Sequence, residues 1–206
     1  MSTRPLRALL GVAAAVVLGG CSGLPDPPDK ADLDPAKAGR LAIEEFDANK
    51  DGKIDSDEIK KSPGLMESLE TMDDDGDGSL TAGEISQRVR EWLDGGTNVF
   101  TESSTVYLDG EPLEGATITY DPEDFLEPGL QPTSGVTDAT GSAFPQGQDA
   151  KYPGLYPGVY SVRISKVVDG RETIPARYNT ETILGKEIGF DAPSTHRLLK
   201  FELTSN

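Results

Sequence analysis

Two twelve-residue segments with the same spacing of oxygen-bearing residues constrain this chain more than any other feature. They span residues 47–58 and 73–84, and each begins with Asp and ends with Glu. A hard divalent cation takes roughly six to eight oxygen ligands, which a short loop can supply around a sharp turn. Glycine occupies position 6 of both segments, as Gly52 and Gly78, where such a turn favours a residue without Cβ. The repeat predicts a pair of metal-binding loops.

Both segments resemble the EF-hand calcium loop, which takes its ligands from positions 1, 3, 5, 7, 9 and 12. The resemblance implies two calcium ions, one for each loop. The candidate ligands are Asp47, Asn49, Asp51, the Lys53 carbonyl, Asp55 and Glu58 in the first loop, and Asp73, Asp75, Asp77, the Ser79 carbonyl, Thr81 and Glu84 in the second. A solvated acidic run or an Asp-rich turn is the alternative, but chance would rarely give two complete matches with periodic apolar flanks.

Apolar residues around the loops extend the match. Position 8 carries Ile54 and Leu80, and paired EF-hand loops join through this position in a short two-stranded contact. Apolar residues also lie four and one positions before each loop, a spacing that places them on one helix face. These pairs are Ile43 with Phe46 and Leu69 with Met72.

The segment between the loops is short. Only fourteen residues, Ile59–Met72, separate them, so the helix that leaves the first loop must be very short. Ser62 and Pro63 suit an N-cap followed by a first-turn proline, which predicts a break near Lys61 and a new helix into the second loop. A first helix is expected from about Pro35 to Phe46. A compact pair that opens little is favoured over a sensor with a wide groove. Dockerin-type modules also pair calcium loops, but theirs usually end in Asp and lack a first entering helix.

The N-terminus indicates export. Arg4 and Arg7 precede an apolar stretch over residues 8–18, too short for a transmembrane helix but suited to a signal-peptide core. The following Leu18–Cys21 resembles a bacterial lipobox, which implies cleavage before Cys21, acylation of its sulfur, and stable membrane attachment. Residues 1–20 are therefore expected to be a lipoprotein signal peptide, and 21–34 a lipidated cysteine with a flexible Pro/Asp tether. Because Ser22 and not Asp follows the cysteine, the expected location is the bacterial cell envelope, in the outer membrane. An ordinary secretory signal with a leftover cysteine is the alternative.

The charge of the chain excludes one class of partner. The formal net charge is −17, and loss of Arg4 and Arg7 with the signal would take it to −19. Such an acidic surface repels phosphate backbones, and no basic patch opposes it, so nucleic-acid binding is not expected.

After Trp92 the pattern changes from helical to alternating, and Gly95 and Gly96 mark the break. Period-two runs separated by turn dipeptides predict antiparallel strands, among them 105–108, 116–120, 160–165 and 199–203. The expected fold class is multidomain α+β: an all-α EF-hand pair over 35–94, then an all-β antiparallel sandwich of about seven strands over 97–206. The β segment is expected to fold without calcium.

Four motifs in this segment resemble the carboxypeptidase-regulatory-like, transthyretin-like β-sandwich, as found in small lipoproteins of planctomycete-type bacteria. They are Val106–Ala116, Ser134–Gly141, Pro157–Lys166 and Ile174–Asn179, and the likeness covers roughly residues 100–204. It implies a fold and no activity, because these domains are accessory modules. The family's G-x-F is one residue longer here, over Gly141–Phe144, which suggests a bulge.

Catalysis is not expected. The one histidine, His196, lies in an alternating run where a surface strand residue is the commoner explanation. The sequence has no Cys nucleophile, G-x-S-x-G elbow or Gly-rich phosphate loop. Carboxylate pairs such as Glu181 with Glu187 could in principle do acid-base work, but acids are abundant here and most of them are expected to be solvated.

Two functions fit these observations. The favoured one is a non-enzymatic, calcium-binding surface lipoprotein in which the ions stabilise the helical domain. The alternative is a calcium-dependent module that binds a protein or glycan partner at the cell envelope. An exposed apolar patch near Met66, Met72 and Trp92 would favour the alternative.

Overall fold

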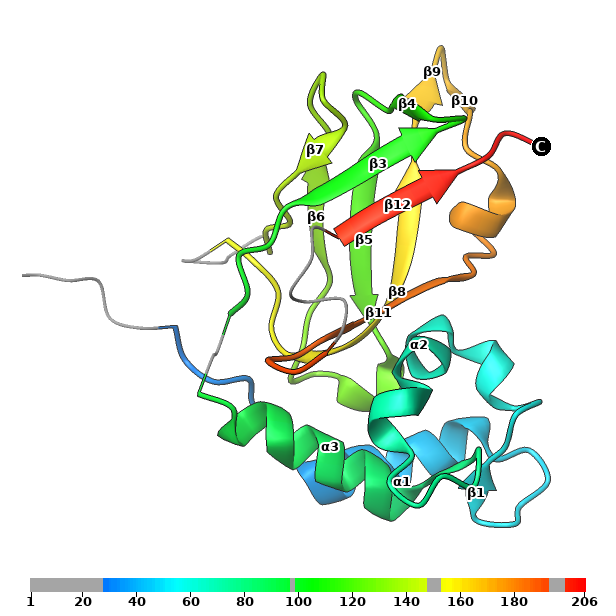
Figure 1. Ribbon diagram of the computed structural model, residues 1–206, viewed down its shortest axis with the longest axis vertical. Coiled ribbons are helices and arrows are strands. Elements are labelled where there is room, and N and C mark those ends of the chain that lie inside the picture. Colours follow the sequence, from blue (N-terminus) through cyan, green and yellow to red (C-terminus); the bar gives the residue numbers. More distant parts are fainter. Residues whose placement is uncertain (1–27, 97–98, 148–152, 193–198) are drawn as a thin grey trace, which may run out of the picture.

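The computed structural model describes residues 28–96, 99–147, 153–192 and 199–206. Over these residues the fold is mixed α+β, with three α-helices at one end of a set of β-strands (Figure 1). The expected signal segment, Cys21 and His196 lie outside the described residues. None of the described helices is long and apolar enough to cross a membrane.

The helical part follows the predicted pattern. Helix α1 (Pro35–Phe46) begins after Asp34, whose carboxylate accepts a hydrogen bond from the backbone N–H of Lys37 at 3.0 Å. The short 3-10 turn η1 (Ile59–Lys61) ends at Ser62, which caps α2 (Pro63–Met72). The first helix and the break near Lys61 are thereby confirmed. Helix α3 (Ala82–Asp94) follows the second loop.

The two acidic loops are paired. Strand β1 (Lys53–Ile54) and strand β2 (Leu80–Thr81) run antiparallel, and Ile54 lies opposite Leu80. Both of these apolar side chains are fully buried. The predicted contact through position 8 is confirmed, so the two loops are held side by side.

The β part contains ten strands among its described residues. They are β3 (Ser104–Leu108), β4 (Glu111–Pro112), β5 (Thr117–Pro122), β6 (Thr133–Val136), β7 (Ser142–Ala143), β8 (Gly158–Ser165), β9 (Val167–Val168), β10 (Arg171–Glu172), β11 (Leu184–Ile188) and β12 (Leu199–Leu203). One sheet has the order β11-β8-β5-β6, the other has the order β12-β3-β4 with β7 also on β3, and β9 and β10 form a hairpin. The short turns η2 (Asp124–Leu126) and η3 (Ala176–Tyr178) lie between strands.

Two expectations for the strands are wrong in detail. Strand β12 pairs with β3 in parallel, so the β part is not wholly antiparallel. Alternation shows which side chains face the core, but it does not reveal the relative direction of strands at opposite ends of a segment. The number of strands exceeds seven because β4, β7, β9 and β10 have two residues each, too few to show a period.

The residues of the lengthened G-x-F motif divide between core and surface. Ala143 is 2% exposed, whereas Phe144 is 65% exposed. The small residue therefore fills the core position of β7, and the aromatic ring points out of the sandwich.

The helices pack directly on the β part. Helix α2 lies against β11 and β8, and α1 against η2 (Figure 1). The buried carboxylate of Glu123, next to η2, accepts hydrogen bonds from the Gly64 backbone N–H at 3.1 Å and the Ser161 hydroxyl at 3.0 Å. Buried apolar side chains from both parts form one cluster. The domain boundary after residue 94, and the independent folding of 97–206, stay predictions.

Candidate metal centre

Three carboxylates converge in the second loop. Asp73, Asp75 and Glu84 each bring one oxygen within 4.8 Å of the others, and they form the only such acidic group among the described residues. Three carboxylates held this close repel one another unless a cation lies between them. Oxygen ligands of this kind suit a hard divalent ion such as calcium.

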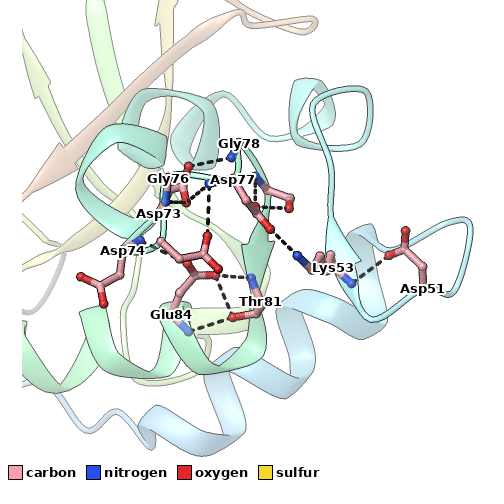
Figure 2. A network of polar contacts seen from close by, with 11 residues as sticks. Asp51, Lys53, Asp73, Asp74, Gly76, Asp77, Gly78, Thr81 and Glu84 are labelled. Carbon is pink, nitrogen blue, oxygen red and sulfur yellow. Dashed lines mark hydrogen bonds and ion pairs between the residues drawn. The ribbon is translucent and has the colours of Figure 1, made fainter.

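Backbone hydrogen bonds fold the second loop around its first residue. Asp73 accepts through Oδ1 from the Gly76 N–H at 2.8 Å and through Oδ2 from the Gly78 N–H at 2.8 Å (Figure 2). Gly78, at position 6, has a φ of +80°, which is a conformation that L side chains rarely adopt. The glycine at this position is thus required by the turn that brings the candidate ligands together.

The last residue of the second loop also caps the following helix. Glu84 Oε2 accepts from the Thr81 N–H at 2.8 Å, and the Thr81 hydroxyl accepts from the Glu84 N–H at 3.2 Å (Figure 2). This reciprocal pair is a capping box for α3. The position-12 carboxylate is therefore fixed by the start of the helix, with its Oε1 turned back to the Asp74 N–H at 3.1 Å.

The first loop repeats most of this scheme. Asp47 accepts from the Gly52 N–H at 2.8 Å, and the buried Glu58 accepts from the Ala48 N–H at 2.7 Å and the Asp55 N–H at 3.0 Å. Its carboxylates do not form a converged group of three like that of the second loop. One reason is chemical, because Asn49 stands at position 3, where the second loop has Asp75.

A lysine of the first loop contacts a ligand candidate of the second. The Lys53 ammonium forms an ion pair with Asp77 Oδ2 across the β1–β2 contact (Figure 2). This hydrogen bond, with those from Ser79, lowers the pKa of Asp77 to about 2, and the same contact raises the pKa of Lys53. Sequence spacing assigned Lys53 only a backbone carbonyl role. The pairing of β1 with β2 is the signal that places its side chain beside the second loop.

The described structure thus brings some candidates together and leaves others apart. Asp73, Asp75 and Glu84 converge, whereas Asp77 is not part of their group and is bonded to Lys53 and Ser79. In the first loop the Asn49 amide lies 3.5 Å from Asp55 Oδ2, and Asp51 Oδ1 accepts from the Lys53 N–H at 3.0 Å. The lipidation candidate Cys21 lies outside the described residues.

Comparison with known proteins supports the interpretation of the first loop as part of an EF hand. A family model described as EF hand matches residues 40–61, which include the end of α1, the whole first loop and η1. No curated protein and no solved structure matches the chain. The EF-hand match supports calcium binding, and it covers one of the two loops.

Substitution of Lys53 by Met is expected to raise the calcium affinity of the second loop by up to about fivefold, because the ammonium no longer competes for the Asp77 carboxylate. The difference between variant and wild type should shrink as KCl is added, since salt screens exposed charges. Calcium titration at several KCl concentrations measures both effects. Lys50→Met is the matched control, because its side chain forms no ion pair among the described residues. Weaker binding by Lys53→Met would contradict a competing role.

Proposed function

We propose that this chain is a non-enzymatic, calcium-binding lipoprotein of the bacterial cell envelope, in which paired EF hands bind two calcium ions. The observation that carries the calcium part is the convergence of Asp73, Asp75 and Glu84 in a loop paired with an EF-hand match. The second loop would hold one ion through this group, and the first loop would hold another with Asp47 and Glu58. Calcium supplies positive charge that offsets the repulsion among these carboxylates.

A stabilising role for calcium is favoured over an interaction role. Met72 and Trp92 are each 2% exposed, and only Met66, at 44%, reaches the surface. A sensor hand exposes an apolar groove to a partner when it binds calcium. Two of the three side chains expected in such a groove are core residues here, which supports a compact pair whose helices stay in place.

The calcium-binding part of the proposal is tested by adding calcium to the soluble chain that begins at Ser22, which contains every described element. Trp92 is buried on α3, so its emission reports on the helix that leaves the second loop. Millimolar calcium should raise the melting temperature followed by this emission, and a chelator should lower it again. Magnesium at the same concentration should act more weakly, because it accepts a bidentate carboxylate poorly. A melting temperature that calcium leaves unchanged, together with no calcium bound in equilibrium dialysis, would refute the proposal.

The envelope part is tested at Cys21. Cys21→Ala should remove the acylated sulfur and release the protein from the membrane fraction, since stable attachment needs the acyl chains. Fractionation followed by mass measurement of the mature N-terminus checks the result. Cys21→Ser should behave in the same way, whereas Ser22→Ala should stay anchored. If wild type and Cys21→Ala both keep the signal segment and both sediment with membranes, the protein is not a lipoprotein.

A further inference from the structure

A buried carboxylate of the β part joins both helices that flank the second loop. Glu187, on β11, is 1% exposed. Its Oε1 accepts hydrogen bonds from Arg88 Nε at 2.6 Å and from Trp92 Nε1 at 3.1 Å, both on α3. Its Oε2 accepts from the Thr71 hydroxyl, on α2. One side chain from a strand therefore holds two helices.

These contacts lie close to the candidate calcium ligands along the chain. Thr71 is two residues before Asp73, the first ligand position, and Arg88 is four residues after Glu84, the last one. Hands that act as sensors change the angle between the entering and leaving helices when calcium binds. Here, bonds from both helices to Glu187 restrain that angle.

The surrounding contacts make the attachment rigid. Arg88 is 3% exposed and also bonds Asp191 through Nη2 at 2.8 Å and Nη1 at 3.0 Å. Burial alone would lower the pKa of Arg88, but the hydrogen bonds to Asp191 and the charge of Glu187 raise it, so the guanidinium stays charged. Helix α2 is held closely as well. A Cβ added to Gly185 would lie 1.8 Å from the Pro63 carbonyl oxygen, so α2 begins directly against the backbone of β11.

Moving either helix would break hydrogen bonds to a buried charge. Glu187 accepts hydrogen bonds from both α2 and α3, and breaking a buried, hydrogen-bonded ion pair is strongly unfavourable. In the same structure, Asp73, Asp75 and Glu84 are already converged. The network thus holds the helices in the arrangement that gathers the ligands.

We propose that Glu187 is a positioning residue for the second calcium site: it ties α2 and α3 to β11, raises the calcium affinity of this loop, and couples calcium binding to the stability of the sandwich. The inference rests on the proposed calcium function. Because the coupling is reciprocal, calcium at the second loop also strengthens the attachment of β11. Glu187 bonds the helices on either side of the second loop, so the effect is expected to be larger there than at the first loop.

The test compares Glu187→Gln and Thr71→Val with wild type in the soluble chain from Ser22. The backbone amides of Gly52 and Gly78 report the two loops separately, because each donates to the first Asp of its own loop. In calcium titrations followed by NMR, both variants should raise the calcium concentration at the midpoint of the Gly78 transition by about two- to tenfold, which is the effect expected from the loss of one hydrogen bond. They should change the midpoint of the Gly52 transition by less than about twofold. Calcium should also slow hydrogen exchange in β11 of wild type more than in either variant.

Val106→Ala is the control for a general loss of stability, because Val106 is a buried core residue on β3 in the other sheet. It should leave the Gly78 transition unchanged. If Glu187→Gln does not fold, Thr71→Val alone decides, since it removes the hydroxyl that contacts Glu187 and the Ser68 carbonyl and keeps the shape of the side chain. An unchanged Gly78 transition, an equal change at both glycines, or the same change in Val106→Ala would overturn the positioning role while calcium binding stands. If wild type shows no calcium transition at either glycine, the calcium function fails and this inference fails with it.

Discussion

Arg88→Met is expected to cost about 3–5 kcal/mol of folding free energy, because it leaves the buried Glu187 without its charged partner. Chemical denaturation of the soluble chain, in calcium and in chelator, measures the loss. Both conditions should show a loss, because the ion pair joins α3 to β11, and the loss should be larger in calcium because the network of Glu187 is coupled to the second loop. Arg90→Met is the matched control on the same helix, because Arg90 is exposed and donates hydrogen bonds to the neutral Gln87.

The double variant Arg88→Met with Glu187→Leu should recover a substantial part of the loss, because it removes the unpaired charge and restores apolar packing. Asp191 and Glu91 then lose a partner at a partly exposed site, which costs less. A cost below about 1 kcal/mol for Arg88→Met would show that this interface does not hold the two parts together.

Combined replacement of Glu58 and Glu84 by Gln is expected to abolish the calcium-dependent rise in melting temperature. Position 12 supplies a bidentate carboxylate that closes the ligand shell. Binding to the folded state alone adds about 2.7 kcal/mol per site at a hundredfold excess of ion over Kd. For two sites in a chain of this size, the rise in wild type should be roughly 10–20 °C.

Each single variant should keep roughly half of this rise, with some further loss because the loops are coupled through Ile54 and Leu80. Asp57→Asn with Asp74→Asn is the matched control, since it removes the same charge from each loop at positions 11 and 2, which are not ligand positions. Thermal melts with and without chelator provide the comparison. A double Glu variant that retains the whole rise would mean that calcium binds elsewhere.

Local features of the sequence predicted local structure well. Ser62 and Pro63 indicated the break before α2, and the structure places the cap at Ser62. The apolar residues at position 8 indicated the pairing of the loops, and Ile54 lies opposite Leu80. These signals succeed because caps, tight turns and a loop repeat depend on residues a few positions apart.

Long-range contacts were not predictable in the same way. Most acids of the chain were expected to be solvated, yet Glu187 is buried against Arg88, which lies 99 residues earlier in the chain. A single acid in an alternating run resembles any surface residue, and only the packing of α2 and α3 on β11 gives it partners. The parallel pairing of β12 with β3 is another example, because it joins the two ends of the β segment. Residue pattern specifies faces, whereas tertiary packing specifies partners.

The most direct test of the central claim is a calorimetric calcium titration of the soluble chain from Ser22, with Glu58→Gln, Glu84→Gln and the double variant beside wild type. We expect two calcium ions bound per wild-type chain, one of them lost or greatly weakened in each single variant, and none bound in the double variant. Extracellular hands often have Kd values of about 10⁻⁴ to 10⁻³ M, so the titration must extend to several millimolar. Wild type that binds no calcium in this range, or a double variant that still binds two ions, would contradict the assignment of residues 47–58 and 73–84 as calcium sites.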